Sequence, residues 1–163
     1  MSSTVILDTD FLSAFLKIDR LSLVKGLYQA EQLLVPPAVY REASQTSLLQ
    51  RLAAIPWLRV EAAEPGILSE LSQQDGFFDL GAGEKEAIAL ALQLPGSVLL
   101  MNDNRARREA VQSGVQVVDI PAFLLACKLS GFLDRAQTAE TIRDLQEKDR
   151  YGFRADVLAR LLA

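Results

Sequence analysis

Short apolar runs alternate along this chain with longer segments of helical periodicity, and that alternation limits the fold more than any other feature. The apolar runs cover residues 4–7, 33–35, 58–60, 98–101 and 115–118. Each run is short and lacks an interior proline, which is typical of parallel strands buried on both faces. Strands separated by helices indicate βαβ units. We therefore predict a three-layer α/β/α fold around a doubly wound, five-stranded parallel sheet.

The segments between these runs predict helices, which cover residues 10–18, 21–30, 37–43, 47–54, 67–73, 84–94, 105–113, 120–129, 136–148 and 154–162. Pro37 suits a first helical turn, where its missing N–H costs nothing. Gly114 and Gly131 each follow a helical segment and favour its termination. No repeat or linker divides the 163 residues. We expect one domain over residues 1–163, with a helical C-terminal end from about residue 134.

The chain contains no histidine and a single cysteine, Cys127. These counts exclude Ser-His-Asp and Cys-His nucleophilic sites, histidine metal ligands, multi-cysteine zinc sites and intramolecular disulfides. Cys127 lies in an apolar run and is interpreted as a small core residue. The N-terminus shows no targeting signal, and no apolar run is long enough to span a bilayer. We expect a soluble, cytoplasmic protein without membrane association.

Two aspartates follow apolar runs closely. Asp8 comes directly after Val5-Ile6-Leu7, and Asp103 follows residues 98–101 with one residue, Asn102, between them. Ligands bind at the carboxyl ends of the strands in open α/β sheets. If the first and fourth strands are neighbours at the topological switch point, the two carboxylates converge.

Two glutamates are predicted on apolar helix faces. Glu42 lies three residues after Val39, and Glu84 precedes Ala87 and Ile88 at spacings of three and four. A carboxylate that faces a sheet is costly unless it is paired or binds a metal. Together with Asp8 and Asp103, these acids predict a four-carboxylate site.

Each of these acids also has a simpler interpretation, which the sequence leaves open. Asp8 and Asp103 could cap the helices that follow them. Glu84 could favour the helix dipole, and Glu42 could pair with Arg41 at the surface.

Four oxygen-donor carboxylates suit Mg²⁺ or Mn²⁺, and such ions activate water and neutralise phosphodiester charge. The net charge of −4 is unfavourable for binding nucleic acid. Cations held by the carboxylates would offset part of that charge.

Further polar residues lie next to the predicted site. Asp10 is a possible accessory acid, although it could instead cap a helix. Asn104, Arg107 and Arg108 follow Asp103 and could bind substrate phosphates, although a solvated helix face is an equally simple interpretation. Residues 81–83, Gly-Ala-Gly, lack the third glycine of a dinucleotide-binding loop and are interpreted as a turn.

Four segments of the sequence resemble a PIN domain when taken together and in order. They are Val5-Ile6-Leu7-Asp8-Thr9-Asp10, the segment from Val35 to Ala43, the segment from Gly83 to Ala91, and the segment from Leu99 to Arg108. The tail Tyr151-Gly152-Phe153-Arg154 resembles the end of the branch often found beside small antitoxin-like proteins. Glu84, in a Gly-Glu context, stands where many family members carry aspartate.

The resemblance implies a Mg²⁺- or Mn²⁺-dependent endoribonuclease similar to the VapC toxins of bacterial toxin–antitoxin pairs. The acidic quartet of that family would fall on Asp8, Glu42, Glu84 and Asp103. Asp8, Glu84 and Asp103 would hold the metal, and Glu42 would orient ligands or the attacking water. The products would carry a 3′-hydroxyl and a 5′-phosphate. The implied partners are an RNA substrate, a small antitoxin protein and a second copy of the chain in a homodimer.

Two other functions remain open at this point. A catalytically inactive module of the same fold could bind RNA or a protein through the arginines after Asp103. A receiver-like phosphoacceptor domain also places acids at strand ends, but it requires a lysine after its last strand. Here that strand is followed by Asp119-Ile120-Pro121, which disfavours the receiver-like alternative.

Overall fold

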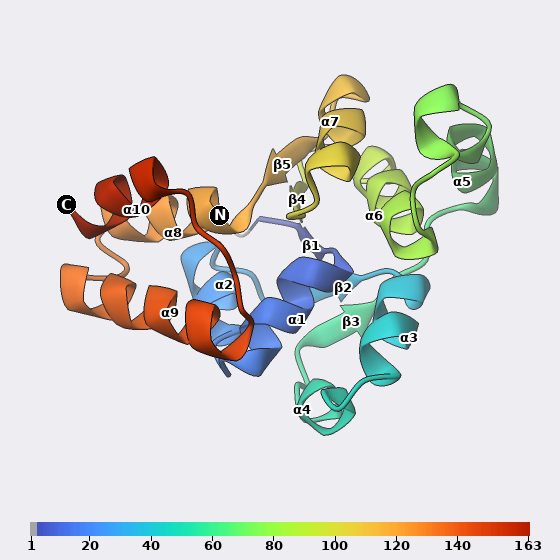
Figure 1. The fold of residues 1–163 in the computed structure, drawn as a ribbon. Helices are drawn as coiled ribbons and strands as arrows, with labels where there is room; N and C mark the ends of the chain where they lie inside the picture. The colour runs from blue at the N-terminus through green and yellow to red at the C-terminus, as the bar shows by residue number, and fades with distance from the viewer. Residues whose placement is uncertain (1–2) are drawn as a thin grey trace.

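The computed structural model describes residues 3–163, which form a parallel sheet flanked by helices (Figure 1). The sheet contains β1 (Val5–Leu7), β2 (Leu33–Val35), β3 (Leu58–Val60), β4 (Val98–Leu100) and β5 (Gln116–Val118). All four strand pairings are parallel, and the spatial order is β3-β2-β1-β4-β5. The predicted five-stranded α/β sheet is confirmed, and β1 lies beside β4 as required for convergence of the aspartates.

The helices agree with the predicted segments to within a few residues at their ends. They are α1 (Thr9–Lys17), α2 (Ser22–Leu27), α3 (Pro37–Ser44), α4 (Leu49–Ala53), α5 (Pro65–Ser72), α6 (Ala82–Gln93), α7 (Asn104–Gln112), α8 (Ile120–Leu129), α9 (Arg135–Lys148) and α10 (Ala155–Leu162). A short 3₁₀ turn over Asp75–Phe77 was not predicted. Gly114 and Gly131 have φ values of 90° and 77°, conformations that glycine adopts at little cost after a helix.

The two faces of the sheet carry separate hydrophobic clusters because side chains alternate along a strand. Val5 and Leu7 of β1 point into a cluster with α1, α2, α8 and α9, whereas Ile6 points to the opposite face, covered by α5, α6 and α7. The three layers follow from this division.

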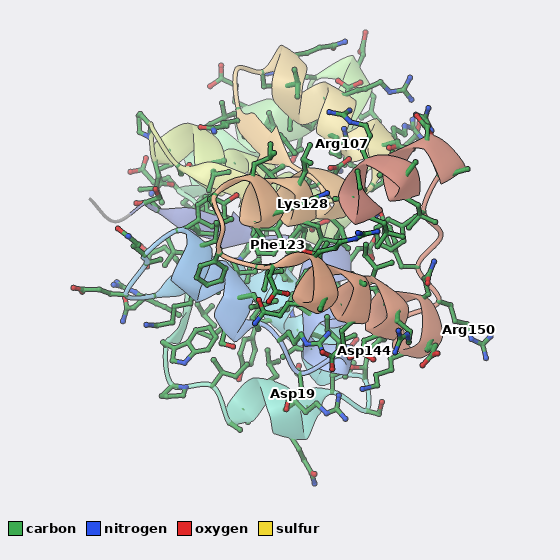
Figure 2. The ribbon with its side chains drawn as sticks, turned by 90° about the vertical axis from the view of Figure 1, so that its left-hand side faces the viewer. Asp19, Arg107, Phe123, Lys128, Asp144 and Arg150 are labelled. Carbon is green, nitrogen blue, oxygen red and sulfur yellow. The ribbon has the colours of Figure 1, made fainter. Side chains whose placement is uncertain are left out.

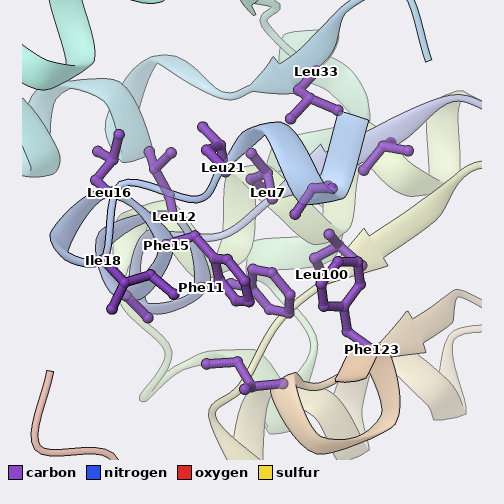
Figure 3. Close-up of a cluster of buried hydrophobic side chains, with 14 of the residues drawn as sticks. Leu7, Phe11, Leu12, Phe15, Leu16, Ile18, Leu21, Leu33, Leu100 and Phe123 are labelled. Carbon is purple, nitrogen blue, oxygen red and sulfur yellow. The ribbon is translucent and has the colours of Figure 1, made fainter. Parts of the chain in front are cut away.

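Three phenylalanines form the centre of the larger cluster (Figure 3). The rings of Phe11 and Phe15 stack with centroids 4.9 Å apart, and Phe123 of α8 packs edge-on against both, at 5.7 and 5.4 Å. All three side chains are fully buried. These contacts fix α1, which begins at the carboxyl end of β1, against the sheet.

The prediction that all five strands are buried on both faces is wrong for β3 and β5. Both lie at edges of the sheet, where one side of the strand has no neighbour. Arg59 and Val60 in β3 and Gln116 in β5 are exposed, with Val60 at 45%. The central strands β1 and β4 are fully buried, as predicted.

Three ion pairs connect α9 and the residue after it to the N-terminal part of the chain, one of them between Arg20 and Glu140 at 3.4 Å. Lys17 at the end of α1 pairs with Asp149 at 2.8 Å, and Arg20 pairs with Asp144 at 2.9 Å. Figure 2 shows Asp144 on α9, which faces the viewer together with α8. Within residues 3–163, no helix has both the length and the apolar character needed to cross a membrane.

Candidate active site

The carboxyl ends of β1 and β4 bring Asp8 and Asp103 to the same edge of the sheet. Leu7 pairs with Leu100 in the ladder, and the Asp8 N–H extends it by donating to the Leu100 carbonyl at 3.0 Å. Asp103 lies two residues after Met101 and is the N-cap residue of α7. The parallel register therefore holds both aspartates at the switch point between the two central strands.

Asp8 is buried, with 2% of its surface exposed, and one of its carboxylate oxygens lacks a partner. It occupies the N-cap position of α1, but its side chain accepts no hydrogen bond from the first turn. Its Oδ1 is buried without a hydrogen bond. The interpretation of Asp8 as an ordinary helix cap therefore fails, and its burial needs another explanation.

Burial raises the pKa of the Asp8 carboxyl to about 8. The negative charges of Glu84, Asp10 and Glu42 contribute to this rise in pKa, while the backbone N–H of Thr9 acts in the opposite direction. The three acids that act on Asp8 come from α6, α1 and α3, so three helices direct carboxylates toward one buried carboxyl.

Glu42 reaches this cluster from the surface. Its carboxylate Oε2 accepts a 2.6 Å hydrogen bond from the hydroxyl of Thr9, the residue next to Asp8. Glu42 is exposed, so its prediction as a carboxylate on an apolar, buried helix face is wrong. The simpler interpretation of Glu42, an ion pair with Arg41 at the surface, is not observed either. The ion pairs among residues 3–163 include neither Glu42 nor Arg41.

Gly83 in the first turn of α6 allows this close approach of α3 and α6. A Cβ atom at Gly83 would lie 3.1 Å from both carboxylate oxygens of Glu42 and 3.2 Å from the hydroxyl of Thr9. Gly83 is part of the helix, so its interpretation as a turn residue is wrong. Its lack of a side chain makes room for the carboxylate.

Glu84 is half-buried at the start of α6, and its Oε1 accepts a 2.9 Å hydrogen bond from the backbone N–H of Gly81. Burial raises the pKa of Glu84, as do the charges of Asp103, Asp10 and Glu42, against the lowering effect of that N–H group. The position in the first helical turn, which the sequence predicted, also favours a negative charge.

Asp103 does cap a helix, as the simpler interpretation of the sequence anticipated. Its Oδ1 accepts a 2.9 Å hydrogen bond from the backbone N–H of Ala106, in the first turn of α7. The residue is exposed, and its charge raises the pKa of both Glu84 and Asp10. Asp103 therefore both caps α7 and faces the acidic cluster, because a cap uses only one of its two oxygens.

Asp10 also faces the cluster. Partial burial raises its pKa, and so do the charges of Asp103, Asp149 and Glu42, while Lys17 lowers it. We call Asp8, Asp10, Glu42, Glu84 and Asp103 the acidic cluster.

The acidic cluster has the donor chemistry of a Mg²⁺ or Mn²⁺ site, since all its ligating atoms are carboxylate oxygens. As positioned, no three Asp, Glu or Cys side chains in residues 3–163 surround a point where an ion could bind. Glu42, Glu84 and Asp103 each have one oxygen engaged locally, by Thr9, Gly81 and Ala106. The unpartnered Oδ1 of Asp8 is the atom that fits a cation best.

The predicted basic side chains are partly engaged with neighbouring residues. Arg107 pairs with Asp119 at 2.9 Å and donates to the Asn104 side chain at 3.1 Å. Arg108 and Asn104 line an open groove of about 600 Å³ along α7, to which Arg107 also contributes. Arg107 is next to Asp103 in space as well, since its backbone N–H donates to the Asp103 carbonyl at 3.0 Å.

Sequence reasoning missed three polar residues that shape the site. The Thr9 hydroxyl holds Glu42. Asn102 Oδ1 accepts hydrogen bonds from the Ile120 N–H at 3.2 Å and from the Tyr151 hydroxyl at 3.0 Å. Thr9 and Asn102 are next to the predicted acids Asp8 and Asp103 in the sequence, and that position could have identified them as site residues. Tyr151 belongs to the tail that resembles the end of one PIN-domain branch, but nothing in the sequence placed it beside Asn102.

The model of a PIN-domain family, DUF3368, matches residues 4–163. Among solved structures, the PIN domain endonuclease Utp24 is similar in fold, with a TM-score of 0.51 and 13% sequence identity. The match covers 72% of this chain and 84% of the Utp24 chain. A comparison with curated proteins finds none that matches. With nearly all of its described length matched by the family model, the chain belongs to the PIN-domain family.

Proposed function

We propose that this protein is a Mg²⁺- or Mn²⁺-dependent endoribonuclease that hydrolyses RNA phosphodiester bonds at the acidic cluster. The observation that carries the proposal is Asp8, a buried carboxyl with an unpartnered oxygen and acidic neighbours. A buried acid without a counter-charge is costly, and a bound cation would remove that cost. Membership of the PIN-domain family and the fold of an endonuclease support the assignment.

In this proposal Asp8, Glu84 and Asp103 hold the cation and Glu42 acts on the attacking water. When bound, the cation would neutralise phosphate charge and make the attacking water more acidic. Glu42 has its Oε2 fixed by the Thr9 hydroxyl, so its Oε1 can orient that water and accept its proton. Asp10 adds negative charge to the same region.

The basic residues of α7 would bind the RNA backbone. Arg108 lines the groove along α7, and the guanidinium group of Arg107 is held by Asp119 and Asn104. Guanidinium groups bind phosphate oxygens in pairs of hydrogen bonds, and such contacts position a strand without reading its sequence.

A cleavage assay tests the proposal. Labelled RNA should be cut in the presence of Mg²⁺ or Mn²⁺ and left intact in EDTA. Asp8→Asn and Asp103→Asn should each reduce the rate by about a hundredfold or more. Asp144→Asn is the matched control, since Asp144 lies in the ion pair with Arg20. Equal rates for Asp8→Asn and the parent protein would contradict the assignment.

The second candidate function is a non-catalytic module that binds RNA or a protein. The observation in its favour is that the acidic cluster, as positioned in residues 3–163, does not surround an ion. Calorimetric titration with Mn²⁺ separates the two functions. The nuclease should bind Mn²⁺ and lose that binding in Asp8→Asn. The module should show no heat of Mn²⁺ binding, no cleavage, and weaker RNA binding in Arg107→Ala.

We further propose that the ribonuclease is a cytoplasmic toxin, active as a homodimer and neutralised by a small antitoxin protein. The support is the VapC-like order of the sequence segments that carry the acidic cluster. Induced expression should arrest bacterial growth, whereas Asp8→Asn at the same protein level should not. Normal growth with the active protein at high level would contradict the toxin role and leave the nuclease proposal unaffected.

A further inference from the structure

A cavity of about 500 Å³ opens beside the acidic cluster. Asn102 and Asn104, the residues on either side of Asp103, form one of its walls. The other walls are formed by Arg107 of α7, by Asp119 and Pro121 at the start of α8, by the segment between α9 and α10, and by Val157 of α10. We call this cavity the Tyr151 pocket. Its size is suited to a ligand no larger than a nucleotide.

The connection between α9 and α10 passes close to α1 before it reaches α10 (Figure 1). Asp149 in this connection pairs with Lys17 of α1. The chain then turns at Arg150, whose φ of 56° is unusual for a residue with a side chain. Such a conformation persists only where the surroundings hold it, so the position of the following residues is determined by the fold.

Hydrogen bonds fix the walls of the pocket. The Tyr151 hydroxyl donates to Asn102 Oδ1 at 3.0 Å, and the Tyr151 N–H donates to the Leu145 carbonyl at 3.0 Å. Arg107 is held by Asp119 at 2.9 Å. Because Asn102 Oδ1 accepts two hydrogen bonds, its amide nitrogen is the part that can donate to a ligand. The pocket is thus preformed.

The aromatic side chains of the pocket are its second distinctive feature. The rings of Tyr151 and Phe153 lie edge to face, with centroids 4.7 Å apart and planes at 65°. Both are half-buried, so part of each ring stays accessible. The Arg154 side chain lines the same pocket, is 80% exposed and pairs with the exposed Asp156 at 3.0 Å, so its guanidinium group keeps free N–H donors. Aromatic rings, amides and a guanidinium group together match a planar base with polar edges and an attached phosphate.

We infer that the Tyr151 pocket binds one unpaired base of the RNA strand, next to the phosphodiester at the acidic cluster. The inference rests on the proposed function, since it assumes an RNA substrate. The base stacks on an aromatic ring while Asn102 or Asn104 bonds to its edge. A paired base is unavailable for such stacking, so the pocket selects single-stranded RNA.

Binding of nucleotides to isotopically labelled protein tests the inference without any need for cleavage. Nuclear magnetic resonance spectra are recorded with AMP, GMP, CMP or UMP at millimolar concentration, in EDTA. At least one nucleotide should shift the Asn102 side-chain amide and the Gly152 backbone amide. Ribose 5-phosphate, which has no base, should shift neither. No shift with any nucleotide, or equal shifts with ribose 5-phosphate, would overturn the inference and leave the pocket to a protein partner.

Substitution of Phe153 provides the second arm. Phe153→Ala should abolish the shifts, and Phe153→Leu keeps apolar volume without an aromatic face if the alanine variant is unstable. The control is Phe132→Ala, because Phe132 is an exposed aromatic next to Gly26 of α2 and does not line the pocket. Shifts that survive Phe153→Leu unchanged would count against stacking.

The two proposals fail in different ways. If single-stranded RNA is cleaved, Phe153→Leu should raise KM about tenfold with a smaller change in kcat. Cleavage with an unchanged KM in Phe153→Leu would overturn the base pocket and leave the nuclease standing. Nucleotide-induced shifts without any cleavage would support the pocket and contradict the nuclease.

Discussion

Acidic side chains gather in two places in this protein, and the two places differ in what faces them. Between α1 and α9, Asp144 and Asp149 lie against Arg20 and Lys17. At the carboxyl edge of the sheet, Asp8 lies against other acids. All three aspartate side chains are largely buried. The difference is the counter-charge. Asp144 and Asp149 each lie beside a basic side chain, whereas the charged neighbours of Asp8 are acids.

The comparison teaches that burial of a carboxylate does not by itself indicate a functional site. A paired acid links two helices and contributes modestly to stability. An ionised acid that is buried among like charges lowers the free energy of unfolding. Such an acid is therefore expected to bind a cation or to hold a proton. Four predictions test this distinction, beginning with the largest expected effect on stability.

The metal-free protein should lose stability as the pH rises from about 4 to about 8. The Asp8 pKa is raised to about 8 from 3.8, so over this range the unfolded chain ionises Asp8 while the folded protein keeps it protonated. Asp8→Asn should remove the largest part of this dependence, leaving the smaller part from the raised pKa values of Asp10 and Glu84, and should stabilise the protein at pH 8 by a few kcal/mol. Thermal unfolding in EDTA measures both effects. A less stable Asp8→Asn protein at pH 8 would show that Asp8 already has a counter-charge.

Mn²⁺ should stabilise the parent protein at pH 8 and leave Asp8→Asn unchanged. A ligand at a hundred times its dissociation constant adds about 3 kcal/mol to the free energy of unfolding. The measurement is the unfolding temperature with and without millimolar Mn²⁺, and Asp144→Asn is the control that should respond like the parent. An equal response in Asp8→Asn would place the cation elsewhere.

Asp144→Asn should destabilise the protein by about 1 kcal/mol, opposite in sign to Asp8→Asn at pH 8. It removes the anion closest to Arg20, whose Nη1 is already buried without a partner. Chemical denaturation measures the change. Because Asp144 lies outside the acidic cluster, RNA cleavage should be unaffected, and a large loss of cleavage would mean that α9 takes part in the site.

Gly83→Ala should change stability by less than about 1 kcal/mol, because alanine favours the helix while its Cβ crowds Glu42. The crowded atoms belong to an exposed, flexible side chain that can move. Cleavage should nevertheless fall about tenfold, since the Glu42 carboxylate leaves the Thr9 hydroxyl. Thr9→Val should produce a similar loss and Thr9→Ser should restore activity. Full activity in Gly83→Ala would contradict the role proposed for Glu42.

Much of the fold follows from local patterns. The predicted segments for β2 and β3 match the strands residue for residue. Both are too short to form a helix, and length is what separates a strand from a buried helix when periodicity does not. Which strands are exposed at the edges of the sheet could not be predicted from local patterns. Residues 58–60 include the charged Arg59, but residues 115–118 (Val-Gln-Val-Val) and 98–101 (Val-Leu-Leu-Met) are both largely apolar. Even so, β5 has a neighbour on one side and β4 on both. Strand order, which depends on distant contacts, decides that difference.

The candidate site divides along the same line. The sequence predicted the acids of the cluster, but it placed Glu42 on a buried face and did not place Tyr151 beside Asn102. Glu42 is directed to the cluster by the Thr9 hydroxyl and by the space at Gly83. Tyr151 reaches Asn102 from 49 positions away along the chain. Neither contact is encoded within one helix or strand.

By itself, the sequence determined the alternation of strands and helices and, through the absence of histidine, a site that can offer a cation only oxygen ligands from its side chains. Only the tertiary structure distinguished Asp8 from Asp103. Both are acids between a strand and a helix, yet Asp103 caps α7 at the surface and Asp8 is buried without a cap. The physical reason is that burial and counter-charge come from neighbouring elements, which no local pattern specifies.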